Sequence, residues 1–364
     1  KYFFKPISIP TLIILIYYQK KVVELPQVFC GKSMLDIVNR IPLLKKEIRW
    51  PIWCYSSYLQ FLYYDKCISL RNRKIANDIY KTEPLIFHDQ EESIIAWGKN
   101  INYSPNIVVL FLHNVCGDYR DNSELAKYLI KTMNCIPVSY SRRGHSMPLK
   151  NPYFNTVGDQ DDLKLVLTKI QQRYMNLPIY AVGSSAGSSL LAKYLGSSAS
   201  SNLISAAALI SPGYGFQQSL MTMPMLQSKL AAKNVKKLFL FPNKQLLQKH
   251  DKQAYNDLYN ATSMLEWHQH QWKFDKTANI ESYYEKHDPV NVLQNIKCPI
   301  LYINAMDDFL FPKKLVSKFT FLTDTCPNTI IVHTKRGGHI GFYTGDSLLW
   351  STKLISDFFK AIKH

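Results

Sequence analysis

The chain has 364 residues, of which 46% are hydrophobic and 20% charged, a balance typical of globular proteins that excludes a disordered chain. Its formal net charge of +17 is unusually high. Lysines are spread along the whole chain without a zinc-finger spacing, an RNA-binding strand motif or a long basic tail, which argues against a nucleic-acid partner. An anionic lipid surface suits a basic protein better, although a biased genome would also enrich Lys, Asn, Ile and Tyr.

The seven cysteines form no CxxC pair. Their odd number and irregular spacing predict neither a disulfide framework nor a metal site. We expect core residues or free thiols, and no cofactor.

An apolar run at residues 7–18 precedes Lys20 and Lys21. It is short for a bilayer span of about 20 residues, so a membrane anchor, a signal peptide and a buried segment are three competing interpretations. We favour an anchor over residues 1–21, because no small-residue cleavage site follows the run. The chain begins with lysine, and we expect an incomplete N-terminus. Residues 22–83 show no sheet pattern and predict short helices and loops that wrap the core.

Strands and helices alternate from residue 84 onwards. Residues 85–98 predict two strands around an acidic turn, and the apolar run at 106–113 predicts a strand buried on both faces. This alternation predicts an α/β domain over residues 84–364, with a mostly parallel sheet covered by helices on both faces. The interval 214–297 is helical in pattern and predicts a cap insertion. Further strands are expected at 135–140, 178–184, 203–211, 299–305 and 328–334, and helices at 121–133, 159–174, 186–196 and 348–362.

A Gly-x-Ser-x-Gly pattern is centred on Ser185, between a predicted strand and a predicted helix, as a nucleophile elbow requires. At Gly183 and Gly187 a side chain would collide with the neighbouring strand or helix. The N-terminus of the following helix points its N–H groups at the site, which favours a developing oxyanion. We expect the Ala186 N–H to be the first oxyanion donor.

A serine hydroxyl needs a base, and the base needs an acid. His339 follows two glycines after the last predicted strand, where the imidazole would lie over the carboxyl end of the sheet. Asp307 and Asp308 follow the preceding strand, and the order Ser, Asp, His is that of an α/β-hydrolase. We choose Asp308 as the acid because Asp-x-x-x-Pro is a common shape for this loop, and expect Asp307 to brace the turn. Taken in isolation, His339 would be interpreted as a solvated loop residue, and Asp307 and Asp308 as residues that cap a turn.

The second oxyanion donor should come from the loop after the strand that ends at His113, and we expect it to be the Val115 N–H. Arg143 and Gly144 follow the next strand and are expected to brace the site.

These motifs resemble the membrane-anchored α/β-hydrolase-domain lipases, the group that includes the YheT-like esterases. The resemblance rests on the serine pattern with residues 190–196, on 303–308 and on 337–345. Residues 258–267 and 280–308 are most similar to the progesterone-responsive acylglycerol lipase branch, which cleaves monoacylglycerols. The resemblance implies an α/β-hydrolase fold and a single-pass N-terminal anchor in the endoplasmic reticulum or plasma membrane. It also implies a catalytic triad of Ser185, Asp308 and His339.

The chain departs from this family at three positions. Ser188 replaces a glycine, Ala186 replaces a leucine or methionine, and Asn114 replaces a glycine of the oxyanion loop. Asparagine tolerates a left-handed backbone better than most residues, so we expect the loop to survive. His113 and Asp118 have a His-x4-Asp spacing that is noted in acyltransferases, but a strand end followed by a turn produces it easily.

The sequence therefore predicts a serine hydrolase of acyl esters, with a monoacylglycerol as lipid substrate and a membrane surface as partner. An acyltransferase or thioesterase on the same triad is one alternative. A lipid- or steroid-binding protein with a weak site is the other, favoured by the departures but opposed by the presence of all three triad residues. Five cap residues are expected to shape an acyl pocket, namely Met221, Met223, Met225, Trp267 and Trp272.

Overall fold

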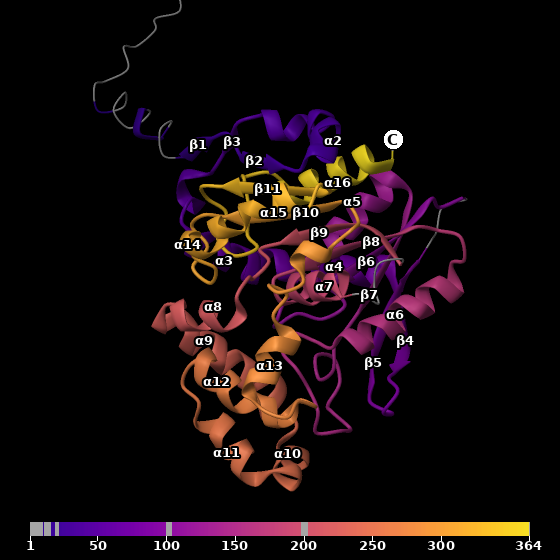
Figure 1. Ribbon diagram of the computed structural model, residues 1–364, viewed down its shortest axis with the longest axis vertical. Coiled ribbons are helices and arrows are strands. Elements are labelled where there is room, and N and C mark those ends of the chain that lie inside the picture. The colour runs from indigo at the N-terminus through magenta and orange to yellow at the C-terminus, as the bar shows by residue number, and fades with distance from the viewer. Residues whose placement is uncertain (1–9, 11–15, 19–21, 100–103, 198–202, 364) are drawn as a thin grey trace, which may run out of the picture.

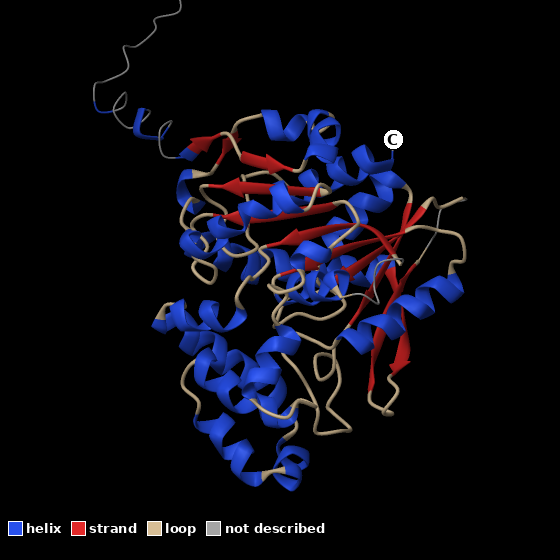
Figure 2. Ribbon diagram, in the orientation of Figure 1, coloured by secondary structure: helices blue, strands red, loops and turns tan. Residues whose placement is uncertain are grey.

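The computed structural model describes residues 10, 16–18, 22–99, 104–197 and 203–363. Its main feature is a nine-stranded sheet with the order β2-β11-β10-β9-β8-β6-β7-β5-β4, which runs across the upper part of the molecule (Figures 1 and 2). The strands are β2 (Gln27–Cys30), β4 (Tyr80–Ile86), β5 (Glu92–Gly98), β6 (Ile107–Leu112), β7 (Cys135–Tyr140), β8 (Ile179–Ser184), β9 (Ile204–Ile210), β10 (Ile300–Ala305) and β11 (Thr329–Thr334).

The central strands β6 to β11 run parallel, and β2, β4 and β5 add antiparallel pairs at the two edges. Every residue of β6 is buried, as an uninterrupted apolar run predicts. Alternate side chains of β6 enter two cores, Val109 and Phe111 on one face and Leu110 and Leu112 on the other. The predicted parallel sheet with two covered faces is confirmed.

Two pairs of helices cover the two faces. Helices α5 (Ser123–Met133) and α16 (Trp350–Lys363) pack on one face, and α6 (Gln160–Arg173) and α7 (Ala186–Gly196) on the other. Each lies at its predicted place, within a few residues.

The segment before residue 84 consists largely of short helices, as expected, and it also contributes side chains to the core. Trp50, Tyr64 and Ile68 are buried in the cluster that contains α5 and α16. We did not predict strand β2, which joins the sheet edge antiparallel to β11, because none of its four residues is fully buried. The segment also contains β1 (Val23–Glu24), β3 (Ile48–Arg49), α2 (Leu35–Asn39), α3 (Ser57–Tyr63), α4 (Ser69–Ile79), and the short helices η1 (Lys32–Met34), η2 (Pro42–Lys45), η3 (Ile52–Cys54) and η4 (Tyr64–Ile68).

The anchor predicted at residues 1–21 lies outside the described residues, apart from residues 10 and 16–18, which are helical. Among the residues that the structure describes, no helix combines the length and hydropathy needed to cross a bilayer.

Helices fill the chain between β9 and β10 and form the cap, which lies below the sheet in Figure 1. The cap has its own core around Phe239, Trp267 and Phe274. Its elements are α8 (Phe216–Thr222), α9 (Met225–Val235), η5 (Lys236–Leu240), α10 (Lys244–His250), α11 (Lys252–Asn260), α12 (Met264–Gln271), η6 (Trp272–Phe274), α13 (Ile280–His287) and η7 (Leu293–Asn295).

The five residues expected to shape an acyl pocket do not lie together. Trp267 is buried in the cap core, and Met223 and Trp272 pack against it. Met221 and Met225 are exposed. Trp267 fills the core of the cap, and the two exposed methionines point to solvent. The five residues therefore do not form the acyl pocket that we expected.

Candidate active site

Ser185 lies in a tight turn between β8 and α7, with φ 52° and ψ −115°. A Cβ atom at Gly183 would lie 2.6 Å from the carbonyl oxygen of Gly187, and one at Gly187 would lie 2.4 Å from that of Leu112. Both contacts are with backbone and cannot be relieved by a rotamer change. The two glycines are therefore required for this turn, residues 183–187, which we call the serine elbow.

The structure brings Ser185, His339 and Asp308 together from the ends of β8, β11 and β10. His339 Nε2 lies 2.7 Å from Ser185 Oγ, and His339 Nδ1 lies 2.9 Å from Asp308 Oδ2. The other carboxylate oxygen of Asp308 accepts N–H groups from Leu310 and Phe311, at 2.8 and 3.2 Å. All three side chains are buried. A proton on Nδ1 that is donated to Asp308 leaves Nε2 free to accept the serine proton.

The loop that carries His339, residues 335–345, is called here the histidine loop. Its backbone is strained, since Ile340 and Phe342 have φ values of 57° and 46°, in the region that L-residues rarely adopt. Such a conformation persists only where the surroundings impose it.

Four side chains from distant segments hold the histidine loop. Glu24 accepts the Lys335 and Arg336 N–H groups at 2.6 and 3.3 Å. Gln60 Oε1 accepts the Tyr343 N–H at 2.7 Å, and Gln60 Nε2 donates to the Tyr343 carbonyl at 2.9 Å. Ser211 Oγ accepts the Ile340 N–H at 3.1 Å. Asp307 Oδ1 accepts the Gly338 N–H at 2.9 Å, so it braces the histidine loop, whereas we expected it to brace its own turn. Sequence reasoning missed Gln60 and Ser211, because neither belongs to a motif.

Helix α3 presses directly on this loop. A Cβ atom at Gly338 would lie 2.6 Å from the carbonyl oxygen of Ser57, so the glycine lets the α3 backbone approach. Burial raises the pKa of the neighbouring Asp307 carboxyl to about 7.

The expected oxyanion donors lie on two elements. Ala186 is the first residue of α7, so its N–H has no acceptor within the helix. Val115 lies in the loop between β6 and α5, and its side chain packs against the cap core.

Asn114 does not adopt the left-handed backbone that we considered for it. Its side chain instead accepts the Cys116 N–H at 2.9 Å and donates to Asp121 at 2.6 Å. An Asx turn therefore shapes the loop, and a glycine could not make these bonds.

Arg142, and not Arg143, braces this loop. Its guanidinium is buried and donates to the carbonyl oxygens of His113 and Asn114 at 2.6 and 2.8 Å, and burial lowers its pKa to about 10. His113 Nε2 accepts the Arg142 N–H at 3.1 Å, and Nδ1 donates to the Asn114 carbonyl at 2.8 Å. Asp118 pairs with Arg120. Both members of the His-x4-Asp pair thus have structural partners.

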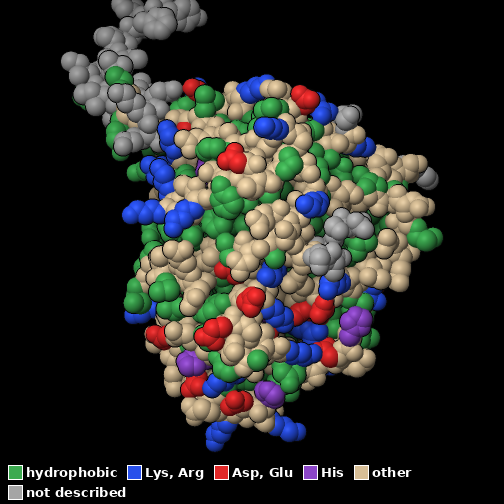
Figure 3. Space-filling model, viewed as in Figure 1, with side chains coloured by type: hydrophobic (Ala, Val, Ile, Leu, Met, Phe, Trp, Pro, Cys, Tyr) green, Lys and Arg blue, Asp and Glu red, His purple; other side chains and the backbone are tan. Residues whose placement is uncertain are grey.

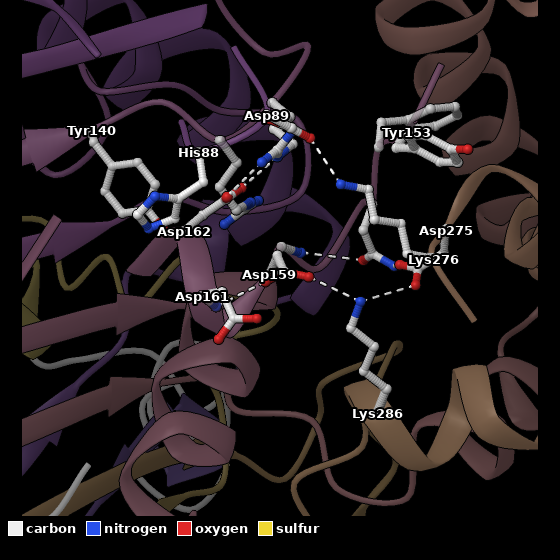
Figure 4. Close-up of a pocket in the computed structure, with 15 residues that line it drawn as sticks. His88, Asp89, Tyr140, Tyr153, Asp159, Asp161, Asp162, Asp275, Lys276 and Lys286 are labelled. Atoms are coloured by element: carbon white, nitrogen blue, oxygen red, sulfur yellow. Dashed lines mark hydrogen bonds and ion pairs between the residues drawn. The ribbon is translucent and has the colours of Figure 1, made fainter. Parts of the chain in front are cut away.

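Arg143 lines a charged cavity of about 430 Å³ between the core and the cap, drawn in Figure 4. It binds Asp162 at 2.6 Å and Asp89 at 2.8 Å. From the cap, Lys276 reaches Asp89 at 2.9 Å, and Lys286 reaches the core residue Asp159 at 2.9 Å. Ser185, Asp308 and His339 do not line this cavity. Its ion pairs fasten the cap to the core.

All seven cysteines are free. Within the described part of the chain, no group of three or more His, Cys, Asp or Glu side chains is placed to hold a metal ion.

Comparison with known proteins finds relatives whose names share the prefix ABHD. Human protein ABHD15 is 29% identical over 264 residues, which cover 70% of this chain and 55% of that protein. Mouse monoacylglycerol lipase ABHD2 is 25% identical over 365 residues, with 90% of this chain and 82% of that protein covered. Mouse phospholipase ABHD3 is 24% identical over 363 residues, with the same coverage. The chain thus spans about half the length of ABHD15 and most of the other two.

Among solved structures, an esterase of Pyrococcus furiosus superposes with a TM-score of 0.52 at 16% identity, over 79% of this chain and 92% of that one. This likeness shows the fold. Residues 107–346, more than half of the chain, match the family described as alpha/beta hydrolase fold. With its sheet order, its serine elbow and these relatives, the chain belongs to the α/β-hydrolase family.

Proposed function

We propose that the protein is a serine hydrolase that cleaves acyl esters of lipids, with monoacylglycerols as its substrate class. The observation that carries this proposal is the pair of contacts from one imidazole, 2.7 Å to Ser185 and 2.9 Å to Asp308. Residues that merely cap turns would not converge from three strand ends into one buried row.

In the first half-reaction, Ser185 Oγ attacks the ester carbonyl carbon while His339 Nε2 takes the hydroxyl proton. Asp308 stabilises the imidazolium. The N–H groups of Ala186 and Val115 hold the oxyanion of the tetrahedral intermediate. His339 then gives its proton to the departing alcohol oxygen, which leaves an acyl-serine.

In the second half-reaction, His339 takes a proton from water as the water attacks the acyl-serine. Collapse of the second intermediate returns the proton to Ser185 and releases a fatty acid. This sequence requires no cofactor. The names of the relatives support a lipid substrate, since one is a monoacylglycerol lipase and another a phospholipase.

The proposal also covers the domain organisation of the chain and the location of the protein in the cell. Residues 84–364 would carry the hydrolase site, with a cap over about 214–297, and the segment 22–83 would complete the sheet and core of the same domain. The protein would work at a membrane surface of the endoplasmic reticulum or the cell, and an anchor within residues 1–21 remains a prediction.

Labelling with a fluorophosphonate, which reacts only with an activated serine, tests the proposal. We expect wild-type protein to be labelled, and Ser185→Ala and His339→Ala to lose the label. Ser189→Ala, a neighbouring serine on α7, is the matched control and should keep it. A folded wild-type protein that takes no label would overturn the proposal.

Release of fatty acid from a monoacylglycerol then tests the substrate class. An added alcohol separates the alternatives, because an acyltransferase would convert it to an ester in preference to releasing free fatty acid. A thioesterase would cleave an acyl thioester faster than the oxygen ester.

A further inference from the structure

Helix α3 and the turn before it expose large apolar side chains beside the histidine loop. Tyr58, Leu59 and Leu62 are exposed and share one side of α3, because they are spaced by three and four residues. Trp53 is 57% exposed, with its ring 5.7 Å from that of Tyr343 in the histidine loop. The opposite side of α3 carries the buried Gln60 that holds this loop.

The cap exposes a second apolar set on α8 and α9. Met221 and Met225 are exposed at the junction of the two helices, and Leu226 and Leu230 follow on α9, where they are 64% and 54% exposed. Leu226 and Leu230 are one helical turn apart and therefore form a continuous stripe.

The two sets flank the loop that follows Asp308. The ring of Tyr58 stacks on that of Phe309, with centroids 5.2 Å apart. On the other side, Phe311 fills the space at Gly213, just before α8, where a Cβ atom would lie 2.6 Å from the ring. In Figure 1, α3 and α14 (Lys313–Val316) lie above α8 and α9 along the same edge of the molecule. We call these two sets together the docking face, formed by Trp53, Tyr58, Leu59, Leu62, Met221, Met225, Leu226 and Leu230.

Positive charge borders the cap half of the docking face and the segment between its two halves. Residues 163–250 contain no Asp or Glu, and the part from 216 to 250 carries six lysines. Lys229 and Lys233 are exposed at helical spacing from Leu226 and Leu230. Lys313, Lys314 and Lys318 are exposed on and just after α14, and Lys and Arg side chains gather on the upper part of this edge in Figure 3.

This composition distinguishes between kinds of partner. Protein–protein interfaces are depleted in lysine. Helices that lie in a lipid interface combine an aromatic and aliphatic side with lysines, whose long stems can lie along the apolar surface while their charges reach the headgroups. Anionic lipid is the partner that complements such a face.

We propose that the protein docks on an anionic lipid surface through the docking face, with α3 and α9 seated among the headgroups and the Asp308 loop between them. This inference rests on the proposed function in one respect: docking would present the serine elbow to a lipid ester. Docking itself requires no turnover, so it can be tested in Ser185→Ala protein.

Trp53 provides a local readout. Of the six tryptophans, Trp50, Trp97, Trp267 and Trp350 are buried, and Trp272 is half-buried. Vesicles of phosphatidylcholine and phosphatidylserine with brominated acyl chains should therefore quench the emission of Trp53. We expect quenching on these vesicles, and its loss in Trp53→Phe. Bound protein without quenching, or equal quenching in Trp53→Phe, would overturn the proposal, even if residues 7–18 bind the vesicle.

The affinity of variants for vesicles tests whether the docking face binds lipid. Leu226→Asp with Leu230→Asp should weaken vesicle binding about tenfold or more. The matched control is Met175→Asp, an exposed apolar residue shortly after α6, which should not change binding. Helix α6 lies at the opposite edge of the molecule from α8 and α9 in Figure 1. Lys229→Glu with Lys233→Glu should remove the preference for phosphatidylserine over pure phosphatidylcholine. Equal binding by all of these variants contradicts the proposal, and circular dichroism checks that each is folded.

The two proposals fail separately. Unlabelled wild-type protein that still shows Trp53 quenching would remove the hydrolase function alone. Fluorophosphonate labelling without quenching would remove the docking face alone.

Discussion

The serine elbow and the histidine loop supply the two sides of one 2.7 Å contact, yet they are held in different ways. Gly183 and Gly187 shape the elbow through close approach of backbone atoms, since a Cβ atom at Gly183 would meet the Gly187 carbonyl and one at Gly187 would meet the Leu112 carbonyl at the end of β6. The histidine loop is held by hydrogen bonds from four side chains in distant parts of the chain, namely Glu24, Gln60, Ser211 and Asp307. The elbow is thus held by close packing of backbone atoms, and the loop by hydrogen bonds from side chains.

The two regions also differ in their sensitivity to conditions. The elbow contains no titratable group except the hydroxyl of its serines. The histidine loop rests on Asp307, a buried carboxyl with a pKa of about 7. Substitutions in the elbow should therefore act through steric clashes. Substitutions around the histidine loop should displace His339 or change how stability depends on pH.

The largest effect should come from Gly187→Ala. The added methyl group would lie 2.4 Å from the Leu112 carbonyl oxygen, so strand β6 or helix α7 must shift, at a cost of about 3 kcal/mol of unfolding free energy. Denaturant unfolding measures this cost, and fluorophosphonate labelling should be lost. Ser189→Ala on the same helix is the control. Equal stability of the two variants would show that a methyl group at position 187 does not clash with the Leu112 carbonyl.

Gln60→Ala should damage the loop without unfolding the protein. It removes both bonds to Tyr343, and a small displacement of a catalytic group can lower the rate about a hundredfold. We expect kcat on a soluble ester to fall with little change in KM. The control is Asn77→Ala, an exposed residue on α4. A KM effect with unchanged kcat would mean that Gln60 contacts substrate rather than positioning His339.

Asp307→Asn should flatten the pH dependence of stability. The carboxyl has a pKa of about 7 in the folded protein and about 3.9 in an unfolded chain. Between these values the folded state keeps a proton that the unfolded state releases, so stability falls as pH rises from about 4 to about 7. Asparagine keeps the acceptor for the Gly338 N–H and has no such proton.

Denaturant unfolding across this pH range measures the change in slope. Some slope should remain, because burial also raises the pKa of Asp121 to about 7. Asp78→Asn, at an exposed position, is the control. A profile as steep in Asp307→Asn as in wild type would contradict the assignment.

Ser188→Gly should have the smallest effect. Ser188 Oγ donates to the carbonyl oxygens of Gly183 and Ile210 at 2.6 and 3.0 Å, which ties the first turn of α7 to two strands. Losing these bonds and adding a helical glycine should cost about 1–2 kcal/mol. Labelling should persist, because the elbow glycines are unchanged. Loss of the label would show that this departure from the family is needed for the reactive geometry.

The sequence alone predicted what depends on short-range patterns. Uninterrupted apolar runs gave the parallel strands, since a strand buried on both faces needs no alternation. The spacing of Gly183, Ser185 and Gly187 predicted the elbow, because the whole pattern lies within five consecutive residues, although the backbone that crowds Gly187 belongs to β6. The Asp-x-x-x-Pro shape selected Asp308, and the place after the last strand selected His339. The structure brings both to hydrogen-bonding distance in the row with Ser185.

Only the tertiary structure decided what depends on distant partners. Strand β2 is an edge strand without a buried face pattern and was invisible in the sequence. Arg142 rather than Arg143 braces the oxyanion loop, because one arginine turns inward to carbonyl oxygens and the next outward to carboxylates. Gln60 lies 283 residues from the backbone that it holds. A hydrogen bond over such a separation leaves no periodicity in the sequence, since only the folded chain brings its two ends together.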